Sequence, residues 1–322
     1  MATPIVIGLS AVVIAIRDGE AVALAVRPRE HGAASPLEGL PFGPFDPDGQ
    51  RTFEIALREF VTQQTGFELG FVEQLYTFGD KGREAPLADV GAGAARVISV
   101  GYLALAPLAL PTRAPGSAWS SFFNFFPWED WRRGRPDLID AAIAPALRAW
   151  AGRSATRLAR VRLLFALEGS AWNEERVLER YELLYEAGLA PEAARDRTRA
   201  LGGAPAEPAA VGLGEPMISD HRRILATGLG RLRGKLKYRP VIFELMSEAF
   251  TLSALQRTVE AISGVALHKQ NFRRVVERTG FVEGLGRVDV ETGGRPAELF
   301  RFRRELLTAR TASGLSLPLV RD

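Results

Sequence analysis

The chain has 322 residues, 47% of them hydrophobic and 25% charged, and its formal net charge is +3 at pH 7. These values are typical of a globular protein with two or three domains. Because cysteine is absent and the three histidines are far apart, disulfides, zinc ribbons and iron–sulfur clusters are excluded, and no metal site is expected. The N-terminus has no basic start and no run of 18 apolar residues occurs, so we expect a cytoplasmic protein without a signal peptide or membrane span.

The N-terminal part of the chain has the pattern of an α/β domain. Two strand-like runs between Pro4 and Arg27 are separated by Asp18-Gly19, a dipeptide that favours a tight hairpin. A loop rich in Pro and Gly follows, and then a helix is predicted from Thr52 to Thr65. Two further strands are predicted, at about residues 72–78 and 96–106.

This order of elements resembles the Nudix fold, and residues 40–43 (LPFG) and 56–67 (ALREFVTQQTGF) carry the resemblance. Nudix hydrolases contain the box GX5EX7REUXEEXGU, whose glutamates hold Mg²⁺ against a pyrophosphate. When the box is aligned on Gly66, Arg51 stands at the early glutamate position, and Gln63 and Gln64 stand at the paired glutamate positions. Neutral amides cannot neutralise a magnesium cluster, so we expect a degenerate Nudix domain with no catalytic residues and no metal. The alternative is that helix 52–65 is only a packing helix.

Candidate ligand-binding residues lie at or near the expected Nudix cleft or in an aromatic and basic stretch that follows it. Residues 117–136 (SAWSSFFNFFPWEDWRRGRP) add seven aromatic residues and three arginines. This stretch has three interpretations: a hydrophobic strap between domains, a dimer contact, or a nucleotide site in which aromatic rings stack on a base and arginines bind phosphates. The candidates are Arg27, Arg51, Arg58, Gln63, Gln64, Trp128 and Arg132.

The middle of the chain is predicted to be helical, at residues 138–167 and 174–200, with a break at Gly188. Residues 202–215 are rich in Gly, Ala and Pro and are typical of a linker. A helix at residues 221–238 contains six Lys and Arg and no acid. It is either the first helix of a DNA-binding domain, with its cations near the DNA backbone, or a hinge that couples a ligand domain to DNA.

Residues 238–302 have the pattern of a winged helix-turn-helix. Thr251 can cap a first helix that Gly264 ends, and a second helix is predicted from about His268 to Thr279. Two strands, around a turn with two glycines, complete the wing. In such a domain the second helix lies in the major groove of DNA, and the wing tip reaches the backbone or the minor groove.

The charge distribution supports this interpretation. From Asp220 to Leu306 there are 17 Lys and Arg against 10 Asp and Glu, a net charge of +7, which leaves −4 for the rest of the chain. The exposed face of the second helix combines Lys, Gln, Asn and Arg, the side chains that contact base edges and phosphates. Winged helices also serve as protein-interaction modules, so this alternative remains open.

The phrases RPVIFELM, FTLSALQ, LHKQNFRR and GGRPAELFRF, together with the degenerate Nudix pattern, resemble the Nudix-related transcriptional regulators of bacterial NAD metabolism. The NadQ type is the most similar subgroup, and the NrtR type is the wider relative. The resemblance implies an α+β chain with a Nudix-like α/β/α sensing domain (residues 1–115), an aromatic strap, helical segment and linker (116–215) and a winged helix DNA-binding domain (216–322).

The resemblance also implies a function. It implies a homodimeric repressor that binds a palindromic operator of NAD biosynthesis or salvage genes and senses ATP, NAD or ADP-ribose without hydrolysing it. The competing hypothesis is an active Nudix-type pyrophosphohydrolase with an accessory winged-helix module. The DNA-binding positions are expected to be Thr251, Ser253, Lys269, Gln270, Asn271, Arg273 and Arg274, with Arg295 in the wing.

Overall fold

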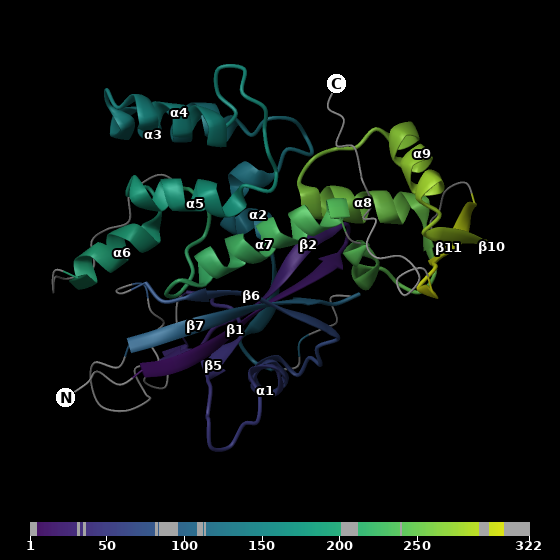
Figure 1. Ribbon diagram of the computed structural model, residues 1–322, viewed down its shortest axis with the longest axis horizontal. Helices are drawn as coiled ribbons and strands as arrows, with labels where there is room; N and C mark the ends of the chain where they lie inside the picture. The colour runs from purple at the N-terminus through teal and green to yellow at the C-terminus, as the bar shows by residue number, and fades with distance from the viewer. Residues whose placement is uncertain are drawn as a thin grey trace.

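A central β-sheet with helices on both faces forms the body of the molecule, and a winged helix lies at one end (Figure 1). The computed structural model describes residues 5–30, 33–34, 37–80, 83, 96–107, 112, 114–200, 212–238, 240–289 and 296–305. No helix within these ranges is long and apolar enough to cross a membrane.

The sheet has six strands in the order β6-β7-β1-β2-β8, with β5 paired to β1. β1 runs parallel to β7, and the other pairs are antiparallel. The strands are β1 (Ile5–Arg17), β2 (Glu20–Val26), β5 (Phe42–Pro44), β6 (Phe71–Phe78), β7 (Arg96–Leu105) and β8 (Ser117–Ser121), while β3 (Arg29–Glu30) and β4 (Ala33–Ala34) pair only with each other. Because β8 pairs with β2, the sheet continues past residue 115.

Local signals in the sequence explain the edges of these elements. Asp18 and Gly19 join β1 to β2 with positive φ angles of 52° and 78°, as the predicted hairpin requires. Helix α1 (Phe53–Thr65) begins at Thr52, whose hydroxyl accepts a hydrogen bond from the Ile55 amide, and ends at Gly66 with a φ of 70°. Its apolar side covers one face of the sheet (Figure 1).

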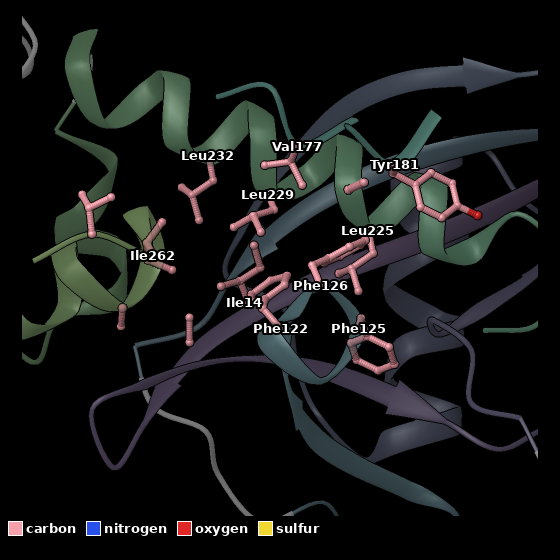
Figure 2. Packing of buried hydrophobic residues seen from close by; sticks show 14 of the residues in the cluster. Ile14, Phe122, Phe125, Phe126, Val177, Tyr181, Leu225, Leu229, Leu232 and Ile262 are labelled. Carbon is pink, nitrogen blue, oxygen red and sulfur yellow. The ribbon is translucent and has the colours of Figure 1, made fainter. Parts of the chain in front are cut away.

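Helix α7 (His221–Tyr238) covers the other face of the sheet, and α5 (Val177–Glu186) packs on its outer side. Gly228 lets α7 approach β1 closely, because a Cβ there would lie 2.8 Å from Cγ1 of Val12. Figure 2 shows Leu225 and Leu229 of α7 packed close to Ile14 of β1. α7 is therefore an interior helix that packs on the central sheet.

The aromatic stretch 117–136 fills the same layer. Phe122 and Phe125 of α2 (Phe122–Phe125), and Phe126 after it, are completely buried beside α7 (Figure 2). The short helix η1 (Pro127–Glu129) follows. Of the three interpretations, the strap that packs the sheet on the next helices is the one that this burial supports.

The predicted helix 138–167 is broken at Gly152, whose φ of 56° ends its first part, and that first part begins as a π-helix that continues directly into an α-helix. The segments are η2 (Ile139–Ile143), α3 (Ala144–Ala151) and α4 (Ala155–Leu164). The predicted break at Gly188, where φ is 75°, separates α5 from α6 (Pro191–Ala200).

The winged helix contains η3 (Val241–Leu245), β9 (Phe250–Thr251), α8 (Leu252–Ser263), α9 (Lys269–Thr279), β10 (Val282–Asp289) and β11 (Ala297–Phe302). Its strands form a small sheet in the order β10-β11-β9. Gly264 and Gly280 end α8 and α9 in the left-handed conformation, as predicted. Its buried residues join the cluster that extends from Val12 of the sheet to Val276 of α9, so the two parts share one hydrophobic core.

Candidate nucleic-acid interface and ligand pocket

Helix α9 presents a polar, basic face to solvent. Phe272, Val275 and Val276 are buried, and this narrow apolar stripe holds the helix on the domain. Four of the five predicted DNA-facing positions are exposed, and Asn271 is half-buried and accepts a 3.1 Å hydrogen bond from Arg274. The structure thus brings Lys269, Gln270, Asn271, Arg273 and Arg274 together on one helix. Such a face can bind phosphates and read base edges.

The other three predicted DNA-binding residues, Thr251, Ser253 and Arg295, do not belong to α9. Thr251 is buried, and its hydroxyl accepts a 3.1 Å hydrogen bond from the Ala254 amide, so this side chain caps α8. Ser253 is half-buried in the first turn of α8. Arg295 lies outside the described residues.

A cavity of about 480 Å³ lies between the end of β2 and the end of α1. Three of the predicted ligand residues line it: Arg27, Gln63 and Gln64. The remaining lining residues are Val26, Pro28, Phe42, Ala114, Pro115 and Gly116. We call this cavity the α1 pocket.

The three polar side chains of the α1 pocket are held to different degrees, and Gln64 has the shortest hydrogen bonds. The side-chain amide of Gln64 accepts a 3.1 Å hydrogen bond from the Phe42 amide and donates one of 2.6 Å to the Phe42 carbonyl. Nη2 of Arg27 lies 3.4 Å from Oε1 of Glu38, and half of the Arg27 side chain is exposed. Gln63 is exposed. The pocket therefore combines a guanidinium, an amide and an aromatic ring, which suits a phosphorylated aromatic compound.

Two predicted ligand residues, Arg51 and Arg58, do not line this pocket. Arg51 is exposed just before α1. Arg58 is paired with Glu54 at 2.8 Å and donates hydrogen bonds to the carbonyls of Leu69 and Gly70. Arg58 therefore closes the loop that follows α1.

The prediction that Trp128 stacks on a nucleotide base is wrong for this structure. Trp128 is 1% exposed and packs edge-on against Phe126, because the strap must fill the layer beside α7. Arg132 is also remote from the α1 pocket. Its guanidinium forms bidentate hydrogen bonds of 2.8–2.9 Å with Glu20 and with Asp130, so two carboxylates already neutralise it.

Two parts of the α1 pocket were missed by sequence reasoning. Phe42 was not among the predicted ligand residues, although it belongs to the LPFG phrase that carries the Nudix resemblance and could have been found from that phrase. Residues 114–116 have no such signal, because only the pairing of β8 with β2 brings Gly116 to the amide of Arg27, at 2.8 Å. In the described part of the chain, no group of three or more His, Asp or Glu side chains is arranged to hold a metal ion.

Most basic residues of α7 are buried or half-buried, and Arg231 is the exposed one of the six. Arg222 and Arg233 are completely buried. All six cations of the helix have carboxylate partners in other parts of the chain or at its N-terminus. Arg222 is paired with Glu192, and Arg233 is paired with Glu129. Arg223 is paired with Asp80, Glu182 and Asp220, and Lys237 is paired with Glu174 and Glu175. Arg231 and Lys235 share Glu73. Of the two interpretations of this helix, these ion pairs favour the hinge over the one that places its cations near the DNA backbone.

Arg233, through two sets of contacts, joins α7 to the strap and to the winged helix. The carboxylate of Glu129 accepts hydrogen bonds of 2.5 and 2.8 Å from Arg180 and of 2.5 Å from Arg233, and all three side chains are fully buried. We call this group the Glu129 cluster. Arg233 also donates a 2.8 Å hydrogen bond to the carbonyl of Ile262, at the C-terminal end of α8.

The chain around Gly264 completes this junction. The amide of Trp131 donates a 2.6 Å hydrogen bond to the carbonyl of Gly264. A Cβ at Gly264 would collide with the carbonyl oxygen of Glu129, and its φ of 73° also favours glycine. The strap and α7 therefore fix the end of α8, immediately before the turn that leads to α9.

Comparison with known proteins agrees with this arrangement. Residues 242–302 match the NrtR DNA-binding winged helix domain. A stretch of 83 residues is 39% identical to the ADPR responsive transcriptional repressor NtrR of Acinetobacter baylyi. It covers 26% of this chain and 33% of that protein, so the chain spans about a third of this relative's length.

Solved structures extend the likeness of fold to nearly the whole chain. Shewanella oneidensis NrtR, complexed with a 27mer DNA, matches with a TM-score of 0.53 and 19% identity over 94% of this chain and 95% of that one. A MutT/nudix family protein from Enterococcus faecalis matches with a TM-score of 0.53 and 14% identity over 94% and 88%. The chain therefore has the NrtR fold, a Nudix-like domain joined to a C-terminal winged helix of the NrtR DNA-binding type.

Proposed function

We propose that this protein is a ligand-responsive, DNA-binding transcriptional repressor of NAD biosynthesis or salvage genes. The observation that carries the proposal is the exposed basic face of α9 within a segment that matches the NrtR DNA-binding winged helix. A homodimer would place two such helices on the half-sites of a palindromic operator.

The α1 pocket is the proposed effector site. ADP-ribose is the first of the three expected effectors to test, since the repressor from Acinetobacter baylyi is described as ADPR responsive. Arg27 would pair with a phosphate of the nucleotide, and Phe42 would contact its apolar part. Gln63 and Gln64 stand where a hydrolytic Nudix box has glutamates, so we propose binding without hydrolysis.

A continuous chain of contacts supports coupling between this pocket and the winged helix. The amide of Leu40, close to Phe42, donates a 3.0 Å hydrogen bond to Nδ1 of His221 at the start of α7. The Phe42 ring lies edge-on to His221, with the ring centroids 4.8 Å apart. α7 then runs about 27 Å and reaches α8 through Arg233 and the Glu129 cluster. An effector that prefers one arrangement of α7 would shift the spacing of the two recognition helices.

The proposal is tested by fluorescence anisotropy of a labelled promoter fragment from upstream of NAD-synthesis genes. Protein would be titrated without nucleotide, and then with ADP-ribose, NAD and ATP in turn. We expect tight, salt-dependent binding that one nucleotide strengthens or weakens by about 5- to 150-fold. Binding no better than to random DNA under every condition would reject the repressor function. Magnesium-dependent, saturable turnover of ADP-ribose or NADH would reject the non-catalytic pocket.

A further inference from the structure

A second basic surface lies on α4, outside the winged helix. Residues 141–167 contain five arginines and no aspartate or glutamate. In Figure 1, α3 and α4 form a hairpin that stands off from the sheet, near the opposite end of the molecule from α9. The positive charge of this hairpin is thus separate from the surface assigned to the operator.

The helix α4 is unusually exposed for its length. Only Val161 and Leu164 of its ten residues are buried. Leu158 and Leu163 are 38% and 48% exposed. A helix that packs through so few residues leaves most of its circumference available to a partner.

Among the described residues, most of the arginines in and just before α4 lack carboxylate partners of the kind that neutralise the cations of α7. Arg153 lies in the turn just before α4, Arg157 lies in the first turn of the helix and Arg162 in its last turn, and all three side chains are exposed. Within the described part of the chain these three have no ion-pair partner, and Arg157 lies over the Trp150 ring at 4.5 Å. Of the five arginines, Arg148 and Arg160 do have partners, Glu168 and Glu186. In this respect α4 resembles α9 and not α7.

We propose that Arg153, Arg157 and Arg162 bind the phosphate backbone of DNA that flanks the operator. The proposal rests on the proposed function, in which α9 already holds the same polyanion. A second contact is then intramolecular and needs little intrinsic affinity. Guanidinium groups bind phosphates in a bidentate manner and do not require a base sequence. An acidic protein surface is the alternative partner.

Two labelled duplexes test this contact with the full-length protein. One contains the operator alone, and the other adds about 15 base pairs, roughly 50 Å, of unrelated DNA on each side. On the long duplex, Arg153→Gln/Arg157→Gln should bind about tenfold more weakly at 0.1 M salt and lower the slope of log affinity against log salt by about 2. On the short duplex it should match the wild type.

A matched control removes the same charge elsewhere. Arg96 and Arg197 are exposed on β7 and α6, and Arg96→Gln/Arg197→Gln should bind both duplexes like the wild type. If Arg153→Gln/Arg157→Gln equals the wild type on both duplexes, or weakens both equally, flanking contact by α4 is wrong. The first of these results would favour the acidic protein. Failure of the wild type to bind either duplex would instead reject the proposed function itself.

Discussion

The helices α7 and α9 have similar basic sequences and opposite environments. α7 contains six Lys and Arg and no acid, and α9 contains four against one acid. α7 also has six buried apolar residues, Ile224, Leu225, Ala226, Leu229, Leu232 and Leu236, which face more than one side, whereas α9 has only three buried residues. The width of the apolar stripe, and not the charge, decides which helix is interior. Cations on an interior helix must then meet carboxylates from elsewhere.

The comparison predicts that the same substitution, Arg→Met, destabilises the protein strongly in α7 and hardly at all in α9. Arg233→Met in α7 removes a buried partner of Glu129 and leaves the Ile262 carbonyl without its donor. We expect the free energy of unfolding to fall by about 3–5 kcal/mol. Arg273 in α9 is exposed, so Arg273→Met should change the free energy of unfolding by less than about 0.5 kcal/mol. Urea unfolding followed by circular dichroism measures both, and equal stability of the two variants would contradict the assigned environments.

The same contrast applies to DNA binding, with the order reversed. Arg273→Ala/Arg274→Ala removes two exposed cations from the proposed recognition face. We expect a loss of about 2–6 kcal/mol in operator binding, at least 30-fold in affinity, without loss of nucleotide binding. Arg231→Ala in α7 should leave operator affinity unchanged, because Arg231 lies 3.8 Å from Glu73 of β6, beside the central sheet. Fluorescence anisotropy titrations at one salt concentration measure the operator affinities of both variants. Retained affinity in the double variant would exclude α9 as the recognition helix.

The ends of α8 and α9 provide a finer comparison. Gly264 and Gly280 have φ angles of 73° and 66°, so alanine is strained to a similar degree at both. A Cβ at Gly280 meets nothing within 4 Å, whereas at Gly264 it collides with the Glu129 carbonyl. Gly280→Ala should cost about 1 kcal/mol of stability and Gly264→Ala about 2 kcal/mol more. If thermal unfolding shows equal costs, the strap does not fix the end of α8.

Local signals were sufficient for much of the fold. Thr52, Thr251 and the glycines after α1, α8 and α9 predicted the helix ends, because capping depends on residues within one turn. The exposed face of α9 was predictable for the same reason, since its narrow apolar stripe is visible in eleven residues.

The environments of the buried charges were not predictable in this way. Arg233 meets Glu129, which lies 104 residues earlier in the chain. Trp128 looked suitable for base stacking until the packing of the strap beside α7 placed it inside. In the α1 pocket, Arg27, Gln63 and Gln64 were found from the Nudix spacing, whereas Ala114, Pro115 and Gly116 depend on strand pairing that no local pattern encodes.

The last prediction concerns the pH dependence of stability at the buried start of α7. Burial lowers the pKa of His221 to about 3, below the value of about 6.5 in an unfolded chain. Below pH 6.5 the unfolded protein therefore binds a proton that the folded protein does not, and stability falls by up to about 1.4 kcal/mol per pH unit until about pH 3. Asp220 acts in the opposite direction, since burial raises its pKa to about 7 and acidification below pH 7 then favours the folded state.

The effects of His221 and Asp220 on stability therefore nearly cancel in the wild type between about pH 4 and 6.5. A substitution of one of the two residues is needed to measure the effect of either. His221→Asn keeps an acceptor for the Leu40 amide but cannot titrate. Its stability should rise on acidification through this range, by up to about 1.4 kcal/mol per pH unit relative to the wild type. Urea unfolding at several pH values measures the difference between the two curves. Parallel curves would mean that His221 is protonated equally in the folded and unfolded states, and the buried contact between the α1 pocket and α7 would then be wrong.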